Sequence, residues 1–360
     1  MSFRDIRDQD VAVKLLRNML VRNRIPNGLL FWGPGGIGKR RTAIEMAKAL
    51  DCAQANGDAC DACLPCRKIT SGNHPDVAYI NPVKKSRIID VETIQSMNEL
   101  ASLRPFEAKW RVFIIQDAER MGLPAQNHFL KTLEEPPGNS LFILLTEFPG
   151  ALLPTIRSRC QRVRFGTLRP ETVSSLLREH RDISPEIALS IAGLAQGQMS
   201  RALDFVDSDK RDVALSIMHR LRDGVDPIDL AEEFSSFLNA KRKQIEAAVK
   251  SDTDAADADV SREGKEELKK QQLALAEALI RRDIMDFVYL FETWCRDEEI
   301  YRALGESSHI LNRDQLDELK QAKGADLERR LAALDKARVY LERFLNEERV
   351  FRDLFFALAQ

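Results

Sequence analysis

The 360-residue sequence has no long hydrophobic run and almost no excess charge of either sign. No stretch approaches the roughly 20 apolar residues of a membrane-spanning helix, and the first residues lack the apolar core of a signal peptide. We therefore expect a soluble, cytoplasmic protein that makes no membrane contact. The formal net charge of -2 excludes nucleic-acid binding by the whole molecule, so any such contact needs a local basic surface.

Cysteine is scarce, yet four of the six cysteines gather in one short segment, Cys52, Cys60, Cys63 and Cys66. In a reducing compartment, thiols at this density indicate a metal rather than disulfides. Four thiolates fill the tetrahedral coordination of one structural Zn²⁺. An iron–sulfur cluster is an alternative, although the closing Cys-Pro of a ferredoxin-type run is missing. Four thiols without a metal are the other alternative.

The stretch from Gly33 to Arg40 lacks one group of a phosphate-binding P-loop. A P-loop reads G-x-x-x-x-G-K followed by Ser or Thr. Its backbone N–H groups cradle the phosphates, its lysine reaches the β- and γ-phosphates, and its hydroxyl binds Mg²⁺. The positions that match are Gly33, Gly35, Gly36, Gly38 and Lys39. Arg40 replaces the hydroxyl residue, and a guanidinium cannot bind a metal ion.

Strand and helix patterns alternate up to residue 166. Strands are predicted at residues 28–32, 76–80, 111–115, 140–146 and 161–165, most of them as apolar runs, and helical spacing recurs at 9–22, 42–50, 90–103 and 123–134. This alternation predicts a doubly wound α/β domain with a parallel sheet. The order strand, Gly-rich loop and helix directs a helix N-terminus at a phosphate.

Strand signals disappear after residue 166. We expect a small all-α segment over residues 167–207 and an all-α C-terminal domain over residues 208–360. The acidic, aromatic-free stretch 251–262 is predicted to be a flexible loop. The cysteine segment, residues 52–66, is predicted to be a zinc module inserted in the α/β domain of residues 1–166.

The strand end at residues 115–119 lacks part of the acidic pair with which a nucleotide hydrolase holds Mg²⁺ and polarises water. If Gln116 takes the metal-binding position, the first carboxylate is an amide. If Asp117 takes it, Ala118 follows where the second carboxylate belongs. Together with Arg40, this strand end predicts weak or absent hydrolysis, and it leaves open whether ATP binds at Lys39.

Four strings resemble a known family. They are F-W-G-P at residues 31–34 leading to the P-loop lysine, the cysteine segment, L-K-T-L-E-E-P-P at 130–137 and L-P-T-I-R-S-R-C at 153–160. Over residues 1–207 the chain resembles the AAA+ subunits of the bacterial sliding-clamp loader, and among them the delta-prime subunits of DNA polymerase III. The resemblance implies a P-loop AAA+ core, a helical lid and a helical collar that holds a hetero-pentamer together.

The resemblance also implies roles for three residues. In the family the S-R-C arginine, here Arg159, reaches into a neighbour's ATP site, where a permanently charged guanidinium matches phosphate oxygens. Arg201 matches an arginine of the lid that senses nucleotide, and Thr146 matches the polar sensor of the γ-phosphate. The plain structural alternatives are an ion pair with a carboxylate for Arg159, a solvated helix start for Arg201 and a turn cap for Thr146.

The partners that the family implies are the other loader subunits, the sliding clamp and primed DNA. Contacts to the DNA backbone need basic side chains without base-reading groups. Candidates, unless they are ordinary solvated surface residues, are Arg4, Arg7, Lys14, Arg17, Arg22, Arg24, Arg104, Lys109 and Arg111.

The resemblance thus implies a delta-prime-like subunit of the DNA polymerase III holoenzyme, which would help ATP-dependent clamp loading in replication and supply Arg159 as an arginine finger. Three alternatives stay open. One is an ATP-hydrolysing, tau/gamma-like subunit in which Thr42 or water replaces the lost metal ligand. The others are a zinc-stabilised scaffold without a catalytic role and a zinc-containing P-loop enzyme unrelated to replication.

Overall fold

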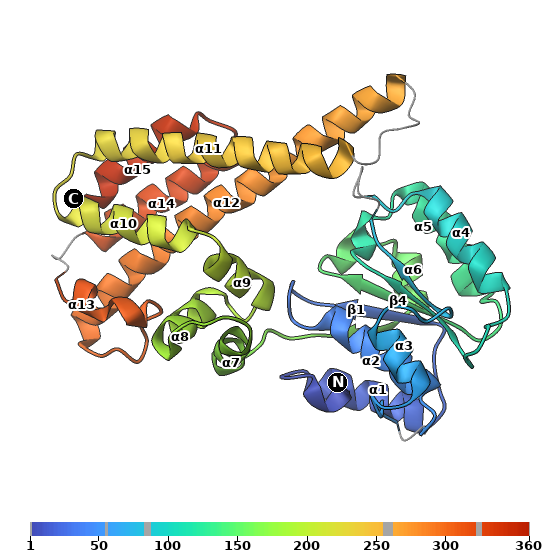
Figure 1. The fold of residues 1–360 in the computed structure, drawn as a ribbon. Coiled ribbons are helices and arrows are strands. Elements are labelled where there is room, and N and C mark those ends of the chain that lie inside the picture. The colour runs from blue at the N-terminus through green and yellow to red at the C-terminus, as the bar shows by residue number, and fades with distance from the viewer. Residues whose placement is uncertain (1, 55–56, 83–87, 255–261, 322–325, 360) are drawn as a thin grey trace. The chain divides into compact units, whose positions relative to one another are not determined.

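The computed structural model describes residues 2–54, 57–82, 88–254, 262–321 and 326–359. The chain forms two compact units, which are coloured along the sequence in Figure 1. The first comprises Met1–Thr172 with Gly197–Ser200, and the second comprises Val173–Gln196 with Arg201–Gln360. The predicted lid segment is therefore divided between the two units, and its boundaries as a separate domain stay a prediction.

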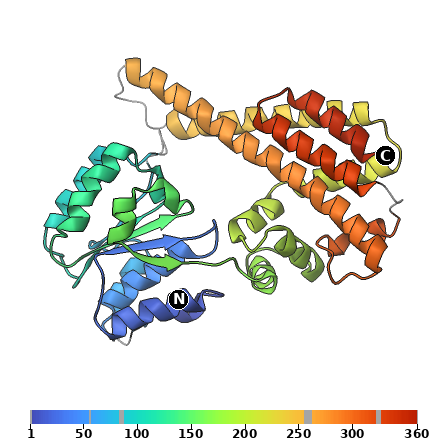
Figure 2. The same ribbon diagram turned by 180° about the vertical axis from the view of Figure 1, so that it is seen from behind.

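The first unit contains a five-stranded parallel sheet with helices on both faces (Figures 1 and 2). Its strands are β1 (Gly28–Trp32), β2 (Val77–Ile80), β3 (Arg111–Ile115), β4 (Ser140–Thr146) and β5 (Gln161–Arg164). They lie in the order β2-β3-β4-β1-β5, and each neighbouring pair is parallel. The predicted α/β fold with a parallel sheet is confirmed, and each predicted strand is present.

Three helices cover each face of the sheet. One face packs against α1 (Asp10–Val21), α2 (Lys39–Asp51) and α3 (Leu64–Thr70), and the other against α4 (Val91–Ser102), α5 (Leu123–Glu134) and α6 (Pro154–Arg159). Within β1, Leu29 and Phe31 belong to the first of these cores and Leu30 to the second. Successive strand residues face opposite sides, so a strand covered on both sides is apolar throughout. Short 3-10 helices lie at η1 (Phe3–Asp5), η2 (Ala118–Arg120) and η3 (Pro149–Ala151).

The parallel arrangement places the carboxyl ends of β1, β3 and β4 at the same edge of the sheet. The Gly-rich loop follows β1 and precedes α2. Gln116 and Asp117 follow β3, and Thr146 is the last residue of β4. The sheet order therefore brings together the three strings that the sequence links to a nucleotide.

The described residues of the second unit contain helices and no strand. Two of these helices, α7 (Pro170–His180) and α9 (Met199–Asp207), begin in the first unit. The other elements are α8 (Pro185–Leu194), α10 (Lys210–Arg222), α11 (Pro227–Asp254), α12 (Arg262–Leu304), η4 (Arg313–Gln315), α13 (Leu316–Leu319), α14 (Leu327–Glu342) and α15 (Glu347–Leu358). Phenylalanines join the long helices: the Phe234 ring lies 4.9 Å from that of Phe287 and 4.8 Å from that of Phe351, between centroids. The predicted helical C-terminal region is confirmed.

The predicted flexible loop over residues 251–262 is wrong at both ends. Helix α11 continues through Asp254, and α12 begins at Arg262. Elongating an existing helix costs little, because each added residue gains a backbone hydrogen bond, so weak helix formers are accepted at its end. Residues 255–261 lie outside the described part of the chain.

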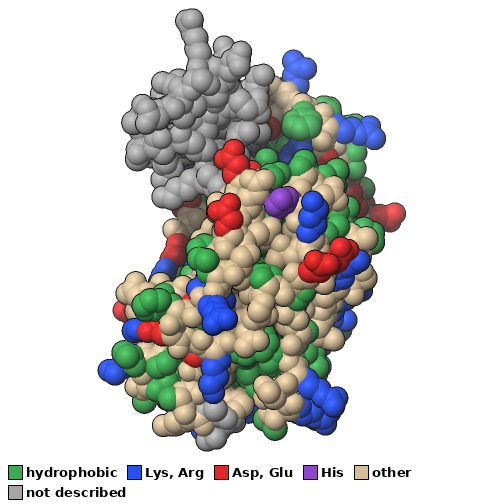
Figure 3. Space-filling view, turned by 90° about the vertical axis from the view of Figure 1, so that its right-hand side faces the viewer, with side chains coloured by type: hydrophobic (Ala, Val, Ile, Leu, Met, Phe, Trp, Pro, Cys, Tyr) green, Lys and Arg blue, Asp and Glu red, His purple; other side chains and the backbone are tan. Residues whose placement is uncertain are grey.

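The side of the first unit on which α4 and α5 lie in Figure 1 carries no continuous charge of one sign (Figure 3). Basic, acidic and apolar side chains are interspersed on it. Tracking a nucleic-acid backbone needs a basic surface, which this side lacks. Among the described residues, no helix is both long and apolar enough to cross a membrane.

Candidate functional site

The loop after β1 depends on glycine for its path. Gly36 has φ of 67° and Gly38 has φ of 98°, a region that side-chain-bearing residues rarely adopt. Gly38 is the N-cap of α2, so the helix begins directly behind the loop. This is the arrangement with which P-loops bind phosphate.

Lys39 folds back onto its own loop. Its Nζ donates to the carbonyl oxygen of Gly33 at 2.5 Å and to that of Pro34 at 2.6 Å. Burial lowers the pKa of Lys39, and this effect outweighs the opposing field of three carboxylates, Glu147, Glu119 and Asp117. The Lys39 ammonium is thus hydrogen-bonded to two carbonyl oxygens and lies in the field of three carboxylates.

Arg40 stands where the metal-binding hydroxyl belongs, and Thr42 is the side chain predicted as its alternative. Arg40 is exposed, and its guanidinium lies 5.8 Å from the centroid of the Tyr79 ring. Thr42 is buried, and its hydroxyl donates to the carbonyl oxygen of Gly38 at 3.0 Å. The hydroxyl of Thr42 is therefore bonded within α2.

The ends of β3 and β4 bring two further carboxylates to this edge. Gln116 Nε2 donates to Asp117 Oδ1 at 3.1 Å, and the Glu147 N–H donates to Glu119 Oε1 at 3.3 Å. Glu119 and Glu147 are neighbours of Lys39 that were not predicted from the sequence. Their positions in the sequence could have indicated them, because Glu119 lies two residues after Asp117 and Glu147 directly follows β4.

Thr146 is buried at the end of β4. Its hydroxyl accepts a hydrogen bond from the Phe148 N–H at 3.1 Å, and its carbonyl oxygen accepts one from the Gly33 N–H at 3.3 Å. The side chain thus caps the turn after the strand. Its role as a nucleotide sensor stays a prediction.

Arg159 ends α6 at the surface. Its Nη2 lies 2.6 Å from Oε1 of Glu134, and its Nη1 donates to the carbonyl oxygen of Thr155 at 3.2 Å. The side chains of Arg159 and Glu134 are 36% and 49% exposed. The L-K-T-L-E-E-P-P and S-R-C strings therefore meet in one ion pair. Exposed pairs of this kind contribute at most about 1 kcal/mol, so Arg159 can change partners at little cost.

Cys160 fixes the end of α6 against the sheet. It is buried, and burial raises its pKa to about 12, so it is a neutral packing residue. A Cβ on Gly28 of β1 would lie 2.9 Å from the Cys160 sulfur, so the glycine leaves the space that the thiol fills. The S-R-C string thus anchors one side chain in the core and presents the preceding one at the surface.

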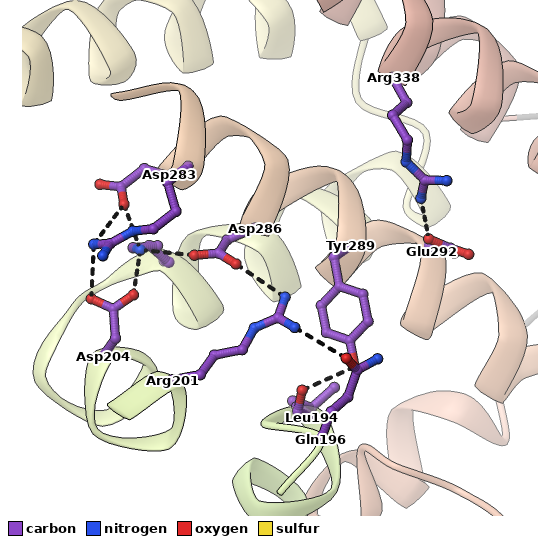
Figure 4. Close-up of polar contacts among 11 residues, drawn as sticks. Leu194, Gln196, Arg201, Asp204, Asp283, Asp286, Tyr289, Glu292 and Arg338 are labelled. Atoms are coloured by element: carbon purple, nitrogen blue, oxygen red, sulfur yellow. Dashed lines mark hydrogen bonds and ion pairs between the residues drawn. The ribbon is translucent and has the colours of Figure 1, made fainter. Parts of the chain in front are cut away.

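Arg201 takes part in a polar network of the second unit, drawn in Figure 4. Its Nη2 lies 3.0 Å from Asp286 Oδ1, and its guanidinium lies 4.1 Å from the centroid of the Tyr289 ring. Nη1 also donates to Gln196 Oε1 at 3.4 Å. The side chain is 21% exposed. Its role in sensing nucleotide stays a prediction, while its contacts here join α9 to α12.

Beside Arg201, a buried lysine sits among three carboxylates. Lys210 Nζ donates to Asp204 at 2.6 Å, to Asp283 at 2.7 Å and to Asp286 at 3.1 Å. The same three aspartates have the spacing of a metal-binding group, but the ammonium of Lys210 already lies within hydrogen-bond distance of all three. Burial alone lowers the pKa of Lys210, and its hydrogen bonds raise the pKa on balance. This cluster ties α9, α10 and α12 together.

The sulfurs of Cys52, Cys60, Cys63 and Cys66 lie within 4.8 Å of one another. Sulfurs bound to one tetrahedral Zn²⁺ at about 2.3 Å stand about 3.8 Å apart, so a small contraction would close the site. Backbone N–H groups of Cys63 and Ala62 lower the pKa of Cys60 to about 6, which favours the thiolate, whereas burial raises the pKa of Cys66 and favours the neutral thiol. These four residues could hold one metal ion.

Two of the basic residues considered for DNA contact have structural roles instead. Arg111 is buried, and its Nη2 lies 2.9 Å from Asp76. Although burial raises the pKa of Asp76, backbone N–H groups and Arg111 lower it to about 2. Arg17 pairs with Asp58 of the cysteine segment. Arg111 and Arg17 therefore form ion pairs within the first unit.

Comparison with known proteins points to one replication complex. A family model described as DNA polymerase III, delta subunit, matches residues 8–169. The DNA polymerase III subunit delta' of Bacillus subtilis (strain 168) is 32% identical over 245 residues, which cover 66% of this chain and 72% of that protein. The subunit tau of the same organism is 32% identical over 211 residues, 57% of this chain and 37% of that protein.

A solved structure gives a more distant likeness. A DNA polymerase III gamma subunit-related protein of Thermotoga maritima is 16% identical, with a TM-score of 0.42 over 98% of this chain and 99% of that one. The match to subunit delta' is much closer, at 32% identity over 72% of that protein, and it shows that this chain belongs to the clamp-loader subunit family of DNA polymerase III.

Proposed function

We propose that this chain is a delta-prime-like clamp-loader subunit that supplies Arg159 to the ATP site of a neighbouring subunit. The observation that carries the proposal is the placement of Arg159, which ends a helix anchored by Cys160 and is held by one exposed carboxylate. In phosphoryl transfer, an arginine supplied by a neighbour stabilises the charge of the transition state. A phosphate would replace Glu134 as the partner of the guanidinium.

In the same proposal, the chain's own site hydrolyses ATP weakly or not at all. Arg40 is the residue that supports this part of the proposal, because Asp117 and Glu119 do place carboxylates near Lys39. P-loop enzymes hold Mg²⁺ through the hydroxyl that follows the lysine, and the ion neutralises charge between the β- and γ-phosphates. Arg40 brings a positive charge there but no metal ligand.

We further propose that Cys52, Cys60, Cys63 and Cys66 hold one structural Zn²⁺. Four thiolates leave no open coordination position, so the ion would cross-link the segment rather than catalyse. The close spacing of the sulfurs favours a single ion over an iron–sulfur cluster, whose thiolates bind different iron atoms. The expected partners are the other subunits of a hetero-pentameric loader, the sliding clamp and primed DNA, with residues 208–360 as the collar.

The test is a loader reconstituted with Arg159→Ala. Hydrolysis at the ATP site that Arg159 faces should fall by about 10³-fold or more, as for other arginine fingers. Arg159→Lys should restore little, because an ammonium lacks the planar fork that matches phosphate oxygens.

The matched control is Arg162→Ala, an exposed arginine on the neighbouring strand β5. It removes the same charge close by and should leave clamp-dependent hydrolysis unchanged. Equal hydrolysis in the Arg159→Ala and wild-type loaders would refute the finger and favour a scaffold without a catalytic role.

A further inference from the structure

The carboxylate of Glu147 lies directly against the Gly-rich loop. A Cβ built on Gly35 would stand 2.6 Å from Glu147 Oε1 and within 3.3 Å of the other two carboxyl atoms. Burial raises the pKa of Glu147, and a hydrogen bond from the Gly35 backbone N–H acts in the opposite direction. In a P-loop, such N–H groups donate hydrogen bonds to the phosphate oxygens.

Lys39 also has its hydrogen-bond partners within the loop itself. Its Nζ donates to the carbonyl oxygens of Gly33 and Pro34, so Lys39 must leave both to reach a phosphate. The carboxylates whose field acts on Lys39 would at the same time repel a polyphosphate, and Glu147 has the largest effect among them. Both recognition elements of the loop thus have protein partners.

The loop is covered at a second point by the segment 197–200 of the same unit. The Met199 N–H donates to the carbonyl oxygen of Gly36 at 3.2 Å. A Cβ built on Gly36 would stand 2.3 Å from the backbone nitrogen of Ser200. This cover packs on Gly36, whereas Glu147 contacts Gly35, so removal of the Glu147 charge alters one of the two contacts and leaves the other in place.

We propose that Glu147 is an internal competitor for the phosphate position of the P-loop, and that it suppresses binding of nucleoside triphosphate to this chain. The glutamate carboxylate takes the hydrogen bond of the Gly35 N–H and adds a negative charge where the phosphates of a nucleotide would lie. The loop keeps its glycines and Lys39, so it remains competent to bind the polyphosphate once that charge is removed. This inference concerns the chain's own loop and does not depend on Arg159.

The experiment measures ATP binding to the full isolated chain without Mg²⁺, so that the lost metal ligand plays no part. Glu147→Gln keeps the size of the side chain and removes its charge, and it should tighten the dissociation constant for ATP at least tenfold. Glu119→Gln is the matched control, because it removes an equal charge near Lys39 at a carboxylate that does not contact Gly35. It should produce a clearly smaller change.

Two further variants make the result decisive. Adding Lys39→Ala to Glu147→Gln should abolish the gain, which would locate the ATP at the P-loop. Glu147→Ala provides a second test with the side chain removed. An unchanged dissociation constant in Glu147→Gln and Glu147→Ala would overturn the proposal. So would an equal gain in Glu119→Gln, or a gain that survives loss of Lys39. Because these measurements use the isolated chain, their failure would leave the role of Arg159 untouched.

Discussion

A nucleotide contact is predicted from the sequence for both Arg159 and Arg201, yet the surroundings of the two side chains differ. Arg159 ends a helix at the surface and pairs with one exposed glutamate. Arg201 is 21% exposed, pairs with Asp286 and stacks on the Tyr289 ring. The carboxylate that Arg201 contacts is shared with the buried Lys210. Arg159 is thus held by an exposed ion pair, whereas Arg201 has several interaction partners within the second unit.

The two arginines differ in the free energy needed to separate each from its protein partners. An exposed ion pair contributes at most about 1 kcal/mol, so a phosphate can displace Glu134 from Arg159. Arg201 would lose an ion pair in which Asp286 is 11% exposed and a cation–π contact that alone is worth about 1 kcal/mol or more. Availability to a ligand therefore separates the two arginines better than motif similarity does.

The largest expected effect on stability is that of Lys210→Met. Removing the ammonium leaves three carboxylates without their shared partner, and breaking a buried pair in this way costs about 3–5 kcal/mol. Urea denaturation followed by a signal of the second unit measures the loss. A loss below about 1 kcal/mol would show that the cluster does not tie α9 to α12.

The same cluster predicts a dependence on alkaline pH. The folded state raises the pKa of Lys210 above its ordinary value of 10.5. The stabilisation is therefore fully present below pH 10.5 and is lost as the pH rises through the raised value. Lys210→Met should lack this part of the alkaline loss of stability.

Arg201→Ala should have the next largest effect, a loss of about 1–2 kcal/mol of stability in the second unit. Asp286 keeps Lys210 as its partner, so no carboxylate is left wholly unpaired. Arg201→Lys should recover part of the loss, because it keeps the charge without the planar stacking on Tyr289. Equal stability of Arg201→Ala and wild type would remove the contrast with Arg159.

Arg159→Ala and Glu134→Gln should each change the free energy of unfolding by less than about 0.5 kcal/mol. In the reconstituted loader the two variants should separate. Arg159→Ala removes the finger, whereas Glu134→Gln only frees it, so hydrolysis should be retained in the second. A loss of hydrolysis as large in Glu134→Gln as in Arg159→Ala would indicate that the ion pair itself, rather than a free arginine, is needed.

The strands β1, β3 and β4 could be predicted because they are buried on both faces and are therefore mostly apolar. The P-loop glycines and the cysteine cluster could be found because their residues are close in sequence. The contact of Glu147 with Gly35 could not be found, since it depends on β4 lying beside β1 in the sheet. The partner of Arg201 could not be found either, because Asp286 is 85 residues away on another helix.

The most direct test of the central claim compares Lys39→Ala with Arg159→Ala in otherwise identical reconstituted loaders. If the chain serves a neighbour's ATP site and not its own, Lys39→Ala should leave clamp-dependent ATP turnover within about twofold of wild type, and Arg159→Ala should lower it by more than about tenfold. A loss in Lys39→Ala as large as that in Arg159→Ala would contradict the account, because hydrolysis would then depend on the chain's own loop.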